Sequence, residues 1–343
     1  MKFKNILIVK LSAIGDVIHA LPVAGALKAA DPSVQVTWIV ERPAYDLLVN
    51  HPNIDRIIVF DKARFKKGNG FFKELAALAR ELRQHQFDLA LDLQGLFKSA
   101  LISLLSGAPT RLVYCNAREL SNWFAKRVCG AYRDGHVVER YLDVARYLGC
   151  KVNHADFAIH ITEAEAAQAA ATAQKAGLDL RQRYVILAPG ANWPNKCWPA
   201  ERFAELADRL AQDGLIPVVV GGPKEKEVFE EIIANTKTPP INLIGRTSLK
   251  ELAYVIQNAQ AFVGGDTGPM HLAAAMGTKV VALFGPTDPK RNGPYGEGHQ
   301  ALLVSRKCQG CWKRSCPENV DCLAEITTES VLDALKYIGF GRQ

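Results

Sequence analysis

The sequence predicts an α/β protein built from two doubly wound parallel sheets, and three observations support this. Short β-branched runs alternate with segments of helical spacing along most of the chain, as in successive βαβ units. The length of 343 residues suggests two domains rather than one. An Ala-rich helix at residues 162–177, which ends at a glycine, interrupts the alternation once, and the alternation then begins again. Two such halves leave a cleft between them.

The elements of the first half follow from apolar runs and their spacing. Each expected strand is a short apolar or β-branched run, and each expected helix has the 3.6-residue period. The expected strands are residues 6–9, 34–40, 56–60, 88–93 and 110–114. The expected helices are residues 17–30, 71–86, 94–106 and 136–148. Together they define an N-terminal domain at residues 1–160.

The second half repeats this pattern. Its expected strands are residues 184–188, 216–220, 241–244, 261–263 and 279–284. Its expected helices are residues 200–212, 224–235, 249–258 and 269–276. We expect the C-terminal domain at residues 178–325. The remaining segment, 326–343, holds a helix at 328–338 that lies beyond the second sheet and can pack back on the first domain.

Composition limits the class of protein and indicates its partners. A hydrophobic content of 48% and a charged content of 22% are those of a globular protein, and no apolar run reaches 18 residues. The first apolar run is too short for a signal peptide, so we expect a cytoplasmic protein. Residues 1–150 hold 21 Lys and Arg against 14 Asp and Glu, which is the whole excess of +7. This half favours an anionic partner, which is a nucleic acid, an acidic saccharide or a membrane surface.

Two common nucleotide-binding fingerprints are absent from the sequence. Neither half has GxGxxG after its first strand, and GxxxxGK[ST] does not occur. A nicotinamide-dependent dehydrogenase and a P-loop NTPase are therefore disfavoured.

A glycine-rich turn at residues 264–271 separates an expected strand from an expected helix and contains Asp266, Thr267, Gly268 and His271. Ligands of parallel sheets bind at the carboxyl ends of strands, and a helix N-terminus suits phosphate. The ordinary alternative is a βα turn in which glycine permits a positive φ and Asp or Thr caps the helix.

Two more polar turns follow strands of the second half. The turn at 188–199 contains Asn192 and Lys196, and a lysine there can meet a pyrophosphate. The turn at 221–226 contains Glu225, which can accept hydrogen bonds from ribose hydroxyls. Each turn alone is weak evidence, but three such turns on one sheet predict a nucleotide site.

The first half has two polar turns of its own. Asp16 follows the first strand and Ser12, where a carboxylate can accept a proton from a hydroxyl nucleophile; the alternative is a helix cap. Gln94 and Lys98 follow another strand and can bind an anionic acceptor. The alternative is a common polar turn in which the lysine is solvated. Basic and aromatic residues alternate at 62–73, which suits nucleic acid, an anionic lipid surface or a solvated loop.

Cysteines occur singly and in one cluster. We interpret Cys115, Cys129, Cys150 and Cys197 as buried thiols in a reducing compartment. Four thiolates close in sequence can form a tetrahedral structural zinc or iron site, and the alternative is reduced or partly disulfide-bonded loop cysteines. The cluster consists of Cys308, Cys311, Cys316 and Cys322.

Taken together, these motifs resemble those of the bacterial lipopolysaccharide heptosyltransferases, glycosyltransferase family 9. The resemblance spans nearly the whole chain, and the first two stretches look most like heptosyltransferase I. The matching stretches are ILIVKLSAIGDVIHALP at 6–22, DLQGLFKSAL at 92–101, NKCWPAERF at 195–203, GGPKE at 221–225, GGDTGPMHLAAA at 264–275 and GPTDP at 285–289.

The resemblance implies a GT-B fold and an inverting transfer that needs no metal or other cofactor. The second domain would bind ADP-L-glycero-β-D-manno-heptose, and the first would bind Kdo-lipid A or the inner core at the inner-membrane surface. Asp16 would be the general base, with Ser12, Gln94 and Lys98 in the acceptor site. The donor site would comprise Lys196 at the pyrophosphate, Glu225 at the ribose, and Asn192, Asp266, Thr267, Gly268 and His271.

The cysteine cluster departs from heptosyltransferase I. It is similar to clusters of heptosyltransferase II-like proteins and of autotransporter heptosyltransferases, some of which hold iron. The acceptor therefore stays open between the first heptose position, the second and a protein. A sugar-nucleotide epimerase of the same fold is a more distant alternative. A nucleic-acid-binding protein is disfavoured, because polar turns on both sheets would then need separate explanations.

Overall fold

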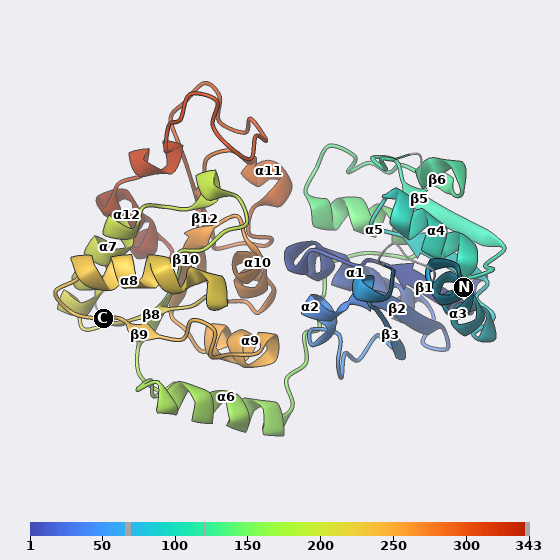
Figure 1. Ribbon diagram of the computed structural model, residues 1–343, viewed down its shortest axis with the longest axis horizontal. Coiled ribbons are helices and arrows are strands. Elements are labelled where there is room, and N and C mark those ends of the chain that lie inside the picture. The colour runs from blue at the N-terminus through green and yellow to red at the C-terminus, as the bar shows by residue number, and fades with distance from the viewer. Residues whose placement is uncertain (66–69, 120, 340–343) are drawn as a thin grey trace. The chain divides into compact units, whose positions relative to one another are not determined.

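The computed structural model describes residues 1–65, 70–119 and 121–339, and it divides into two compact units (Figure 1). The first unit is Met1–His160 and the second is Ile161–Gln343. Each unit contains one six-stranded sheet in which every neighbouring pair is parallel. The prediction of two doubly wound parallel sheets is therefore confirmed.

The sheet of the first unit has the strand order β3-β2-β1-β4-β5-β6. The order reverses between β1 and β4, so their carboxyl ends border the point where such sheets bind ligands. The strands are β1 (Asn5–Val9), β2 (Gln35–Glu41), β3 (Arg56–Phe60), β4 (Leu89–Asp92), β5 (Thr110–Tyr114) and β6 (Lys126–Val128).

Helices cover the first sheet and place its polar turns. Leu78 and Leu82 of α3 and Ile102 of α4 pack in one cluster with Leu7 and Val9 of β1. On α1 and α5, buried apolar side chains bring the two helices together. The helices are α1 (Ile14–Ala30), α2 (Arg42–Tyr45), α3 (Phe71–Gln84), α4 (Phe97–Leu105) and α5 (Val137–Tyr147), with the 3-10 turns η1 (Lys62–Phe65) and η2 (Ser121–Trp123).

The sheet of the second unit has the strand order β12-β11-β10-β7-β8-β9. Here the order reverses between β7 and β10, which places the turns after these two strands side by side. The strands are β7 (Tyr184–Ala188), β8 (Ile216–Val219), β9 (Ile241–Asn242), β10 (Ala261–Gly265), β11 (Val280–Phe284) and β12 (Gln300–Leu303).

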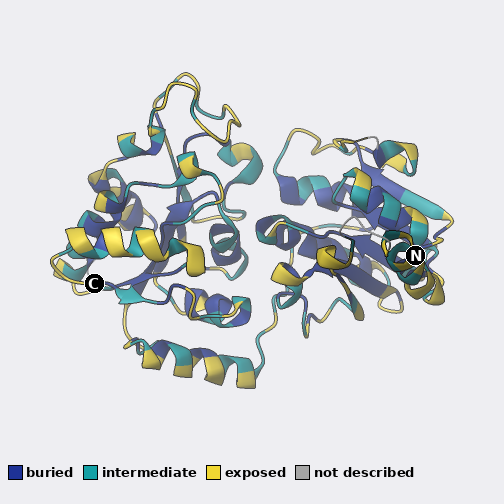
Figure 2. Cartoon of the chain, viewed as in Figure 1, coloured by how far each residue is buried: buried dark blue, intermediate teal, exposed yellow. Residues whose placement is uncertain are grey.

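The core of the second unit contains side chains of α7 and α12 packed on the central strands. The central strands of both sheets are buried, whereas exposed residues line the outer faces of helices such as α6 and α8 (Figure 2). The helices are α6 (Glu163–Lys175), α7 (Ala200–Gln212), α8 (Lys226–Asn235), α9 (Leu249–Gln257), α10 (Gly268–Ala275), α11 (Pro289–Asn292) and α12 (Thr328–Tyr337), with the 3-10 turns η3 (Pro194–Lys196), η4 (Pro223–Glu225) and η5 (Cys322–Glu325).

The last helix has its apolar partners within the second unit. Val331 and Leu335 of α12 are fully buried in the core that also contains Phe203 of α7. The sequence left open a return of this helix to the first domain. Contacts with α7, β11 and β12 account for the apolar face of α12, and the return to the first domain stays a prediction.

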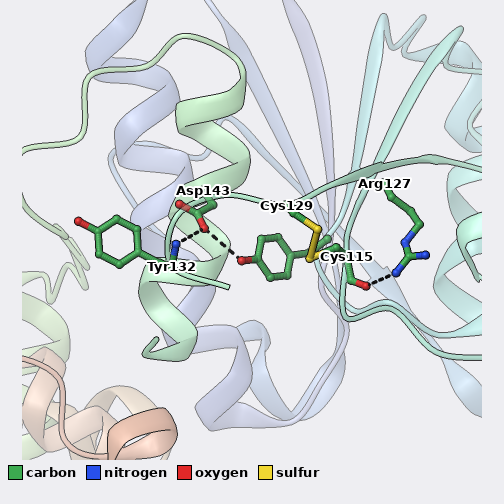
Figure 3. Close-up of a disulfide and its surroundings, with 6 residues drawn as sticks. Cys115, Arg127, Cys129, Tyr132 and Asp143 are labelled. Atoms are coloured by element: carbon green, nitrogen blue, oxygen red, sulfur yellow. Dashed lines mark hydrogen bonds between the residues drawn. A yellow bond between two sulfur atoms is a disulfide. The ribbon is translucent and has the colours of Figure 1, made fainter. Parts of the chain in front are cut away.

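Two of the cysteines expected to be reduced thiols form a disulfide. Cys115 follows β5 and Cys129 follows β6, and these neighbouring strands bring the two sulfurs together (Figure 3). Around the disulfide, Arg127 donates to the Cys115 carbonyl at 2.7 Å, and the Tyr132 N–H donates to Asp143 at 3.0 Å. The interpretation of Cys115 and Cys129 as free thiols is therefore wrong, while Cys150 and Cys197 are free.

The length and apolar character of the helices decide whether any of them could span a membrane. Across the described ranges 1–65, 70–119 and 121–339, none of the helices is both long enough and apolar enough to cross a bilayer.

Candidate functional site

The carboxyl edge of the second sheet holds the three turns that the sequence singled out. They follow β7, β8 and β10, which are adjacent in the sheet. Gly190, after β7, lies so close to Glu225 that a Cβ there would collide with the glutamate side chain. A Cβ on Gly265 would stand 2.5 Å from the Lys196 carbonyl oxygen. These close approaches bring Glu225, Lys196 and the turn after β10 to one edge.

Asp266 is the centre of a buried charged cluster at this edge. Its Oδ2 lies 2.7 Å from the Lys196 Nζ, and its Oδ1 lies 3.1 Å from the His271 Nε2. The Asp266 side chain is 3% exposed and that of Lys196 is 13% exposed. The structure therefore joins three predicted donor-site residues through direct contacts.

The electrostatics of the cluster fix its charge state. Burial alone would raise the pKa of Asp266, but the hydrogen bond and charge of His271, together with Lys196, outweigh burial. The pKa of Asp266 is consequently held well below its ordinary value, so the carboxylate is ionised at neutral pH. An ionised Asp266 holds the Lys196 ammonium at the strand ends, where it can meet an anionic ligand.

The N-terminus of α10 adds hydrogen-bond donors beside this cluster. Gly268 begins the helix after Thr267, whose side chain makes no capping hydrogen bond. The Thr267 Oγ is buried and, within the part of the chain that the structure describes, has no hydrogen-bond partner. Free N–H groups of a first helical turn and a positive dipole end bind phosphate well. Asn192 is exposed in the turn after β7.

The turns of the first unit meet where the strand order reverses. The Gln94 Oε1 accepts hydrogen bonds from the N–H groups of Leu11 and Ser12, at 3.0 and 3.2 Å. Gln94 thus holds the turn after β1 in place. Asp92 is buried and accepts from the Gln94 N–H and from the Ser99 hydroxyl at 3.0 and 2.9 Å.

Asp16 lies in the first turn of α1 and is half-buried. Its Oδ2 accepts from the Ala13 N–H at 3.3 Å; Ala13 is the N-cap, and Asp16 reaches back to it from the third helical position instead of capping the helix itself. A carboxylate has a second oxygen, which is the atom that could take a proton from a ligand. Ser12 immediately precedes this turn and is half-buried.

Lys10 is a charged residue of this region that the sequence motifs did not indicate. It is buried, and its Nζ donates to the Tyr141 hydroxyl at 2.9 Å. Burial alone would lower the pKa of Lys10, but Asp16, Tyr141 and Asp92 outweigh burial, and the pKa is raised. Lys10 is therefore a fixed cation beside Asp16. Its position directly after an apolar strand is the feature of the sequence that could have identified it.

Lys98 forms an ion pair that was not expected. Its Nζ lies 2.6 Å from Glu41, and Lys62 approaches the other oxygen of the same carboxylate at 3.2 Å. Glu41 is the last residue of β2 and is buried. Glu41 thus holds Lys62 and Lys98 at the carboxyl edge of the first sheet, where Lys98 was predicted to bind an acceptor. Of the basic segment 62–73, residues 66–69 lie outside the described residues.

The predicted metal site is not formed. Within residues 1–65, 70–119 and 121–339, no three His, Cys, Asp or Glu side chains are arranged to bind a metal. Cys308 and Cys311 are exposed, and burial raises the pKa of the Cys322 thiol. Backbone hydrogen bonds hold this loop instead, from Gly310 to the Gly285 carbonyl at 3.0 Å and from Trp312 to the Pro286 carbonyl at 2.7 Å. A structural zinc or iron at Cys308, Cys311, Cys316 and Cys322 is therefore not supported.

Comparison with known proteins identifies the family. The model of glycosyltransferase family 9 (heptosyltransferase) matches residues 75–320. Lipopolysaccharide heptosyltransferase 1 of Pseudomonas aeruginosa is 31% identical over 91% of this chain and 87% of its own length. The lipopolysaccharide core heptosyltransferase OpsX of Haemophilus influenzae is 27% identical over 98% and 97%.

A solved structure agrees with these relatives. The Escherichia coli heptosyltransferase WaaC with ADP superimposes with a TM-score of 0.78 and 26% identity, covering 97% of this chain and 99% of that one. The fold is therefore the GT-B fold of that enzyme, as the sequence motifs predicted. With the family model matching well over half of its residues, the chain belongs to glycosyltransferase family 9, the heptosyltransferases.

Proposed function

We propose that this protein is a heptosyltransferase of lipopolysaccharide core biosynthesis. In this proposal it transfers heptose from ADP-L-glycero-β-D-manno-heptose to Kdo or the inner core. The observation that carries the proposal is the buried Lys196–Asp266–His271 cluster beside the N-terminus of α10. A relative of known structure binds ADP, and this cluster supplies the groups that a diphosphate needs.

Each donor-site residue then has a chemical role. Lys196 neutralises the diphosphate, and Asp266 and His271 orient it and the heptose. Thr267, with its buried and unpartnered hydroxyl, and Gly268 offer hydrogen bonds to phosphate oxygens. Glu225 accepts hydrogen bonds from ribose hydroxyls, and Asn192 closes the turn over the nucleotide.

The transfer itself is an inverting displacement. An acceptor hydroxyl oxygen attacks C1 of the heptose while its proton passes to the Asp16 carboxylate. The bond between C1 and the diphosphate oxygen breaks, and ADP leaves with the electron pair. Lys10, a buried cation beside Asp16, acts as a positioning residue that places a fixed positive charge next to the carboxylate.

The acceptor side carries positive charge and exposed aromatic rings. Ser12, Gln94 and Lys98 line the proposed acceptor site, where a lysine suits the carboxylate of Kdo. Nearby, Phe97 is 51% exposed and Trp123 is 73% exposed. Phe97 packs edge-on against Phe124 at a centroid distance of 6.4 Å. Exposed aromatics within a basic half suit a peripheral position at the cytoplasmic face of the inner membrane.

The test is mass spectrometry of transfer products from a panel of nucleotide-sugars with Kdo-lipid A. We expect one heptose to be added from ADP-heptose alone. Asp16→Asn should lose turnover by at least about a hundredfold while its unfolding temperature and ADP affinity stay those of the wild type. Full turnover in Asp16→Asn would disprove the base assignment.

The same assay separates the alternatives. Transfer to heptosyl-Kdo-lipid A, with none to Kdo-lipid A, would assign the second heptose position. Transfer only to a protein acceptor would assign an autotransporter heptosyltransferase. Conversion of the donor without any acceptor would assign an epimerase. A wild-type protein that produces none of these products contradicts the proposed function.

A further inference from the structure

The loop that holds the clustered cysteines lies against the turns of the proposed donor site. Gly310 and Trp312 donate backbone hydrogen bonds to the carbonyls of Gly285 and Pro286, in the turn after β11. The Gln309 side chain donates to the Thr287 carbonyl at 2.9 Å. Because β11 neighbours β10, these bonds fix residues 309–312 at the same carboxyl edge as Asp266.

The same loop also contacts the turn that holds Lys196. The Asn195 side chain donates to the Lys313 carbonyl at 2.7 Å. Trp193, in this turn, then has two cations beside its ring. The Lys196 Nζ lies 4.5 Å from the ring centroid, and the Arg314 guanidinium carbon lies 5.7 Å from it. Arg314 is therefore held near Lys196 by a shared aromatic partner, although the two residues are far apart in sequence.

The charges around Arg314 determine what it can bind. Lys196 is paired with Asp266, whereas the Arg314 guanidinium faces the Trp193 ring and belongs to an exposed residue. A guanidinium offers five N–H donors in a fork that matches phosphate oxygens, and a ring beneath it leaves its edges accessible. Two cations on one ring suit a ligand with more than one negative charge.

We propose that Arg314, which the anchored segment 309–312 holds at the edge of the donor site, binds the diphosphate of the nucleotide-sugar. This inference rests on the proposed function, since it adds a second cation to the site around Lys196 and Asp266. The loop that the sequence marked as a metal site thus serves the ligand through its arginine. Arg314 is a binding residue, and the proton transfer does not involve it.

The test is calorimetric titration of ADP and of adenosine into the wild type, Arg314→Gln, Arg314→Lys and the matched control Lys313→Gln. Lys313 is the adjacent cation, and only its backbone carbonyl takes part in the contact with Asn195. We expect Arg314→Gln to weaken ADP binding about tenfold, Arg314→Lys to stay within about threefold, and Lys313→Gln to match the wild type. Adenosine, which lacks phosphates, should bind all four proteins equally.

Repeating the titration over a range of salt concentrations adds a second readout. Arg314→Gln should show a shallower salt dependence of ADP affinity than the wild type, because one charge contact is missing. The proposal would be overturned if Arg314→Gln bound ADP as tightly as the wild type. It would also be overturned if Lys313→Gln lost as much ADP affinity as Arg314→Gln, because the effect would then come from the overall charge of the loop and not from a direct contact of Arg314. A wild-type protein that binds no ADP would instead overturn the donor site itself, so the two failures are distinguishable.

Discussion

Replacing Asp266 by asparagine tests the buried charged cluster of the second unit. The substitution keeps the size of the side chain but removes its charge, leaving the Lys196 ammonium without its anion. Breaking a buried ion pair from one side costs about 3–5 kcal/mol. Lys196 is 13% exposed and can turn toward water, so the loss should lie near about 3 kcal/mol. For a unit of this size, that corresponds to a fall of about 6–12 °C in unfolding temperature.

Calorimetry of the unliganded protein at pH 7 measures this loss. The matched control is Asp179→Asn, which removes the same charge from an exposed pair with Arg181 whose arginine is 91% exposed. The control should leave the unfolding temperature unchanged, because exposed pairs contribute little. An Asp266→Asn protein that unfolds within about 2 °C of the wild type would refute the reasoning.

The pH dependence of the same comparison follows from the depressed pKa of Asp266. A carboxyl whose pKa is lower in the folded state stabilises the fold above its unfolded value of 3.8. The stability that Asp266 provides is lost as the pH falls through its folded pKa. The gap between wild type and Asp266→Asn should therefore be constant from pH 9 to pH 7 and should close in strong acid. A gap that widens in acid would contradict this assignment.

Three further predictions concern the first unit. Burial raises the pKa of Asp92 to about 6, so between pH 3 and pH 8 the free energy of unfolding of the wild type should fall by about 3 kcal/mol relative to Asp92→Asn, in urea titrations at each pH. Lys10→Met should lower kcat without changing KM for the donor, in steady-state kinetics, because the fixed cation beside Asp16 is removed while the donor site is untouched. Alkylation of the wild type unfolded in denaturant without reductant should label Cys150 but leave Cys115 and Cys129 unlabelled, by peptide mass spectrometry; with dithiothreitol the wild type should unfold at the temperature of Cys129→Ser.

The sequence predicts the strand–turn–helix units well because their signals are local. An apolar run followed by glycine or proline and then by helical spacing identifies the turns after β7, β8 and β10. Asp266 and Lys196 were both found this way. Their ion pair was not, because it joins residues 70 positions apart, and only the strand order brings them together.

Residues whose role depends on burial were missed. Lys10 and Glu41 each end an apolar strand, and in the sequence each looks like the first polar residue of a turn. The structure buries both residues, and burial gives weight to the hydrogen bond of Lys10 with Tyr141 and to the ion pairs of Glu41. The cysteines show the same limit. Close spacing does not fix the direction of side chains in a loop, and the partner of Cys115 was hidden because β6 is only three residues long.

Gly264 and Gly265 were singled out by the sequence, but the structure requires glycine there for a different reason than the one expected. The sequence allows a glycine after β10 because glycine tolerates positive φ. Neither Gly264 nor Gly265 has a φ in the left-handed region. Instead, the Ala188 carbonyl oxygen would stand 2.9 Å from a Cβ at Gly264, and the Lys196 carbonyl oxygen would stand 2.5 Å from one at Gly265. At Gly264 the neighbouring strand β7 comes too close for a side chain, and at Gly265 the turn that holds Lys196 crosses the end of β10. Glycine is therefore required for close approach, and the crossing at Gly265 brings the Lys196 turn up to Asp266.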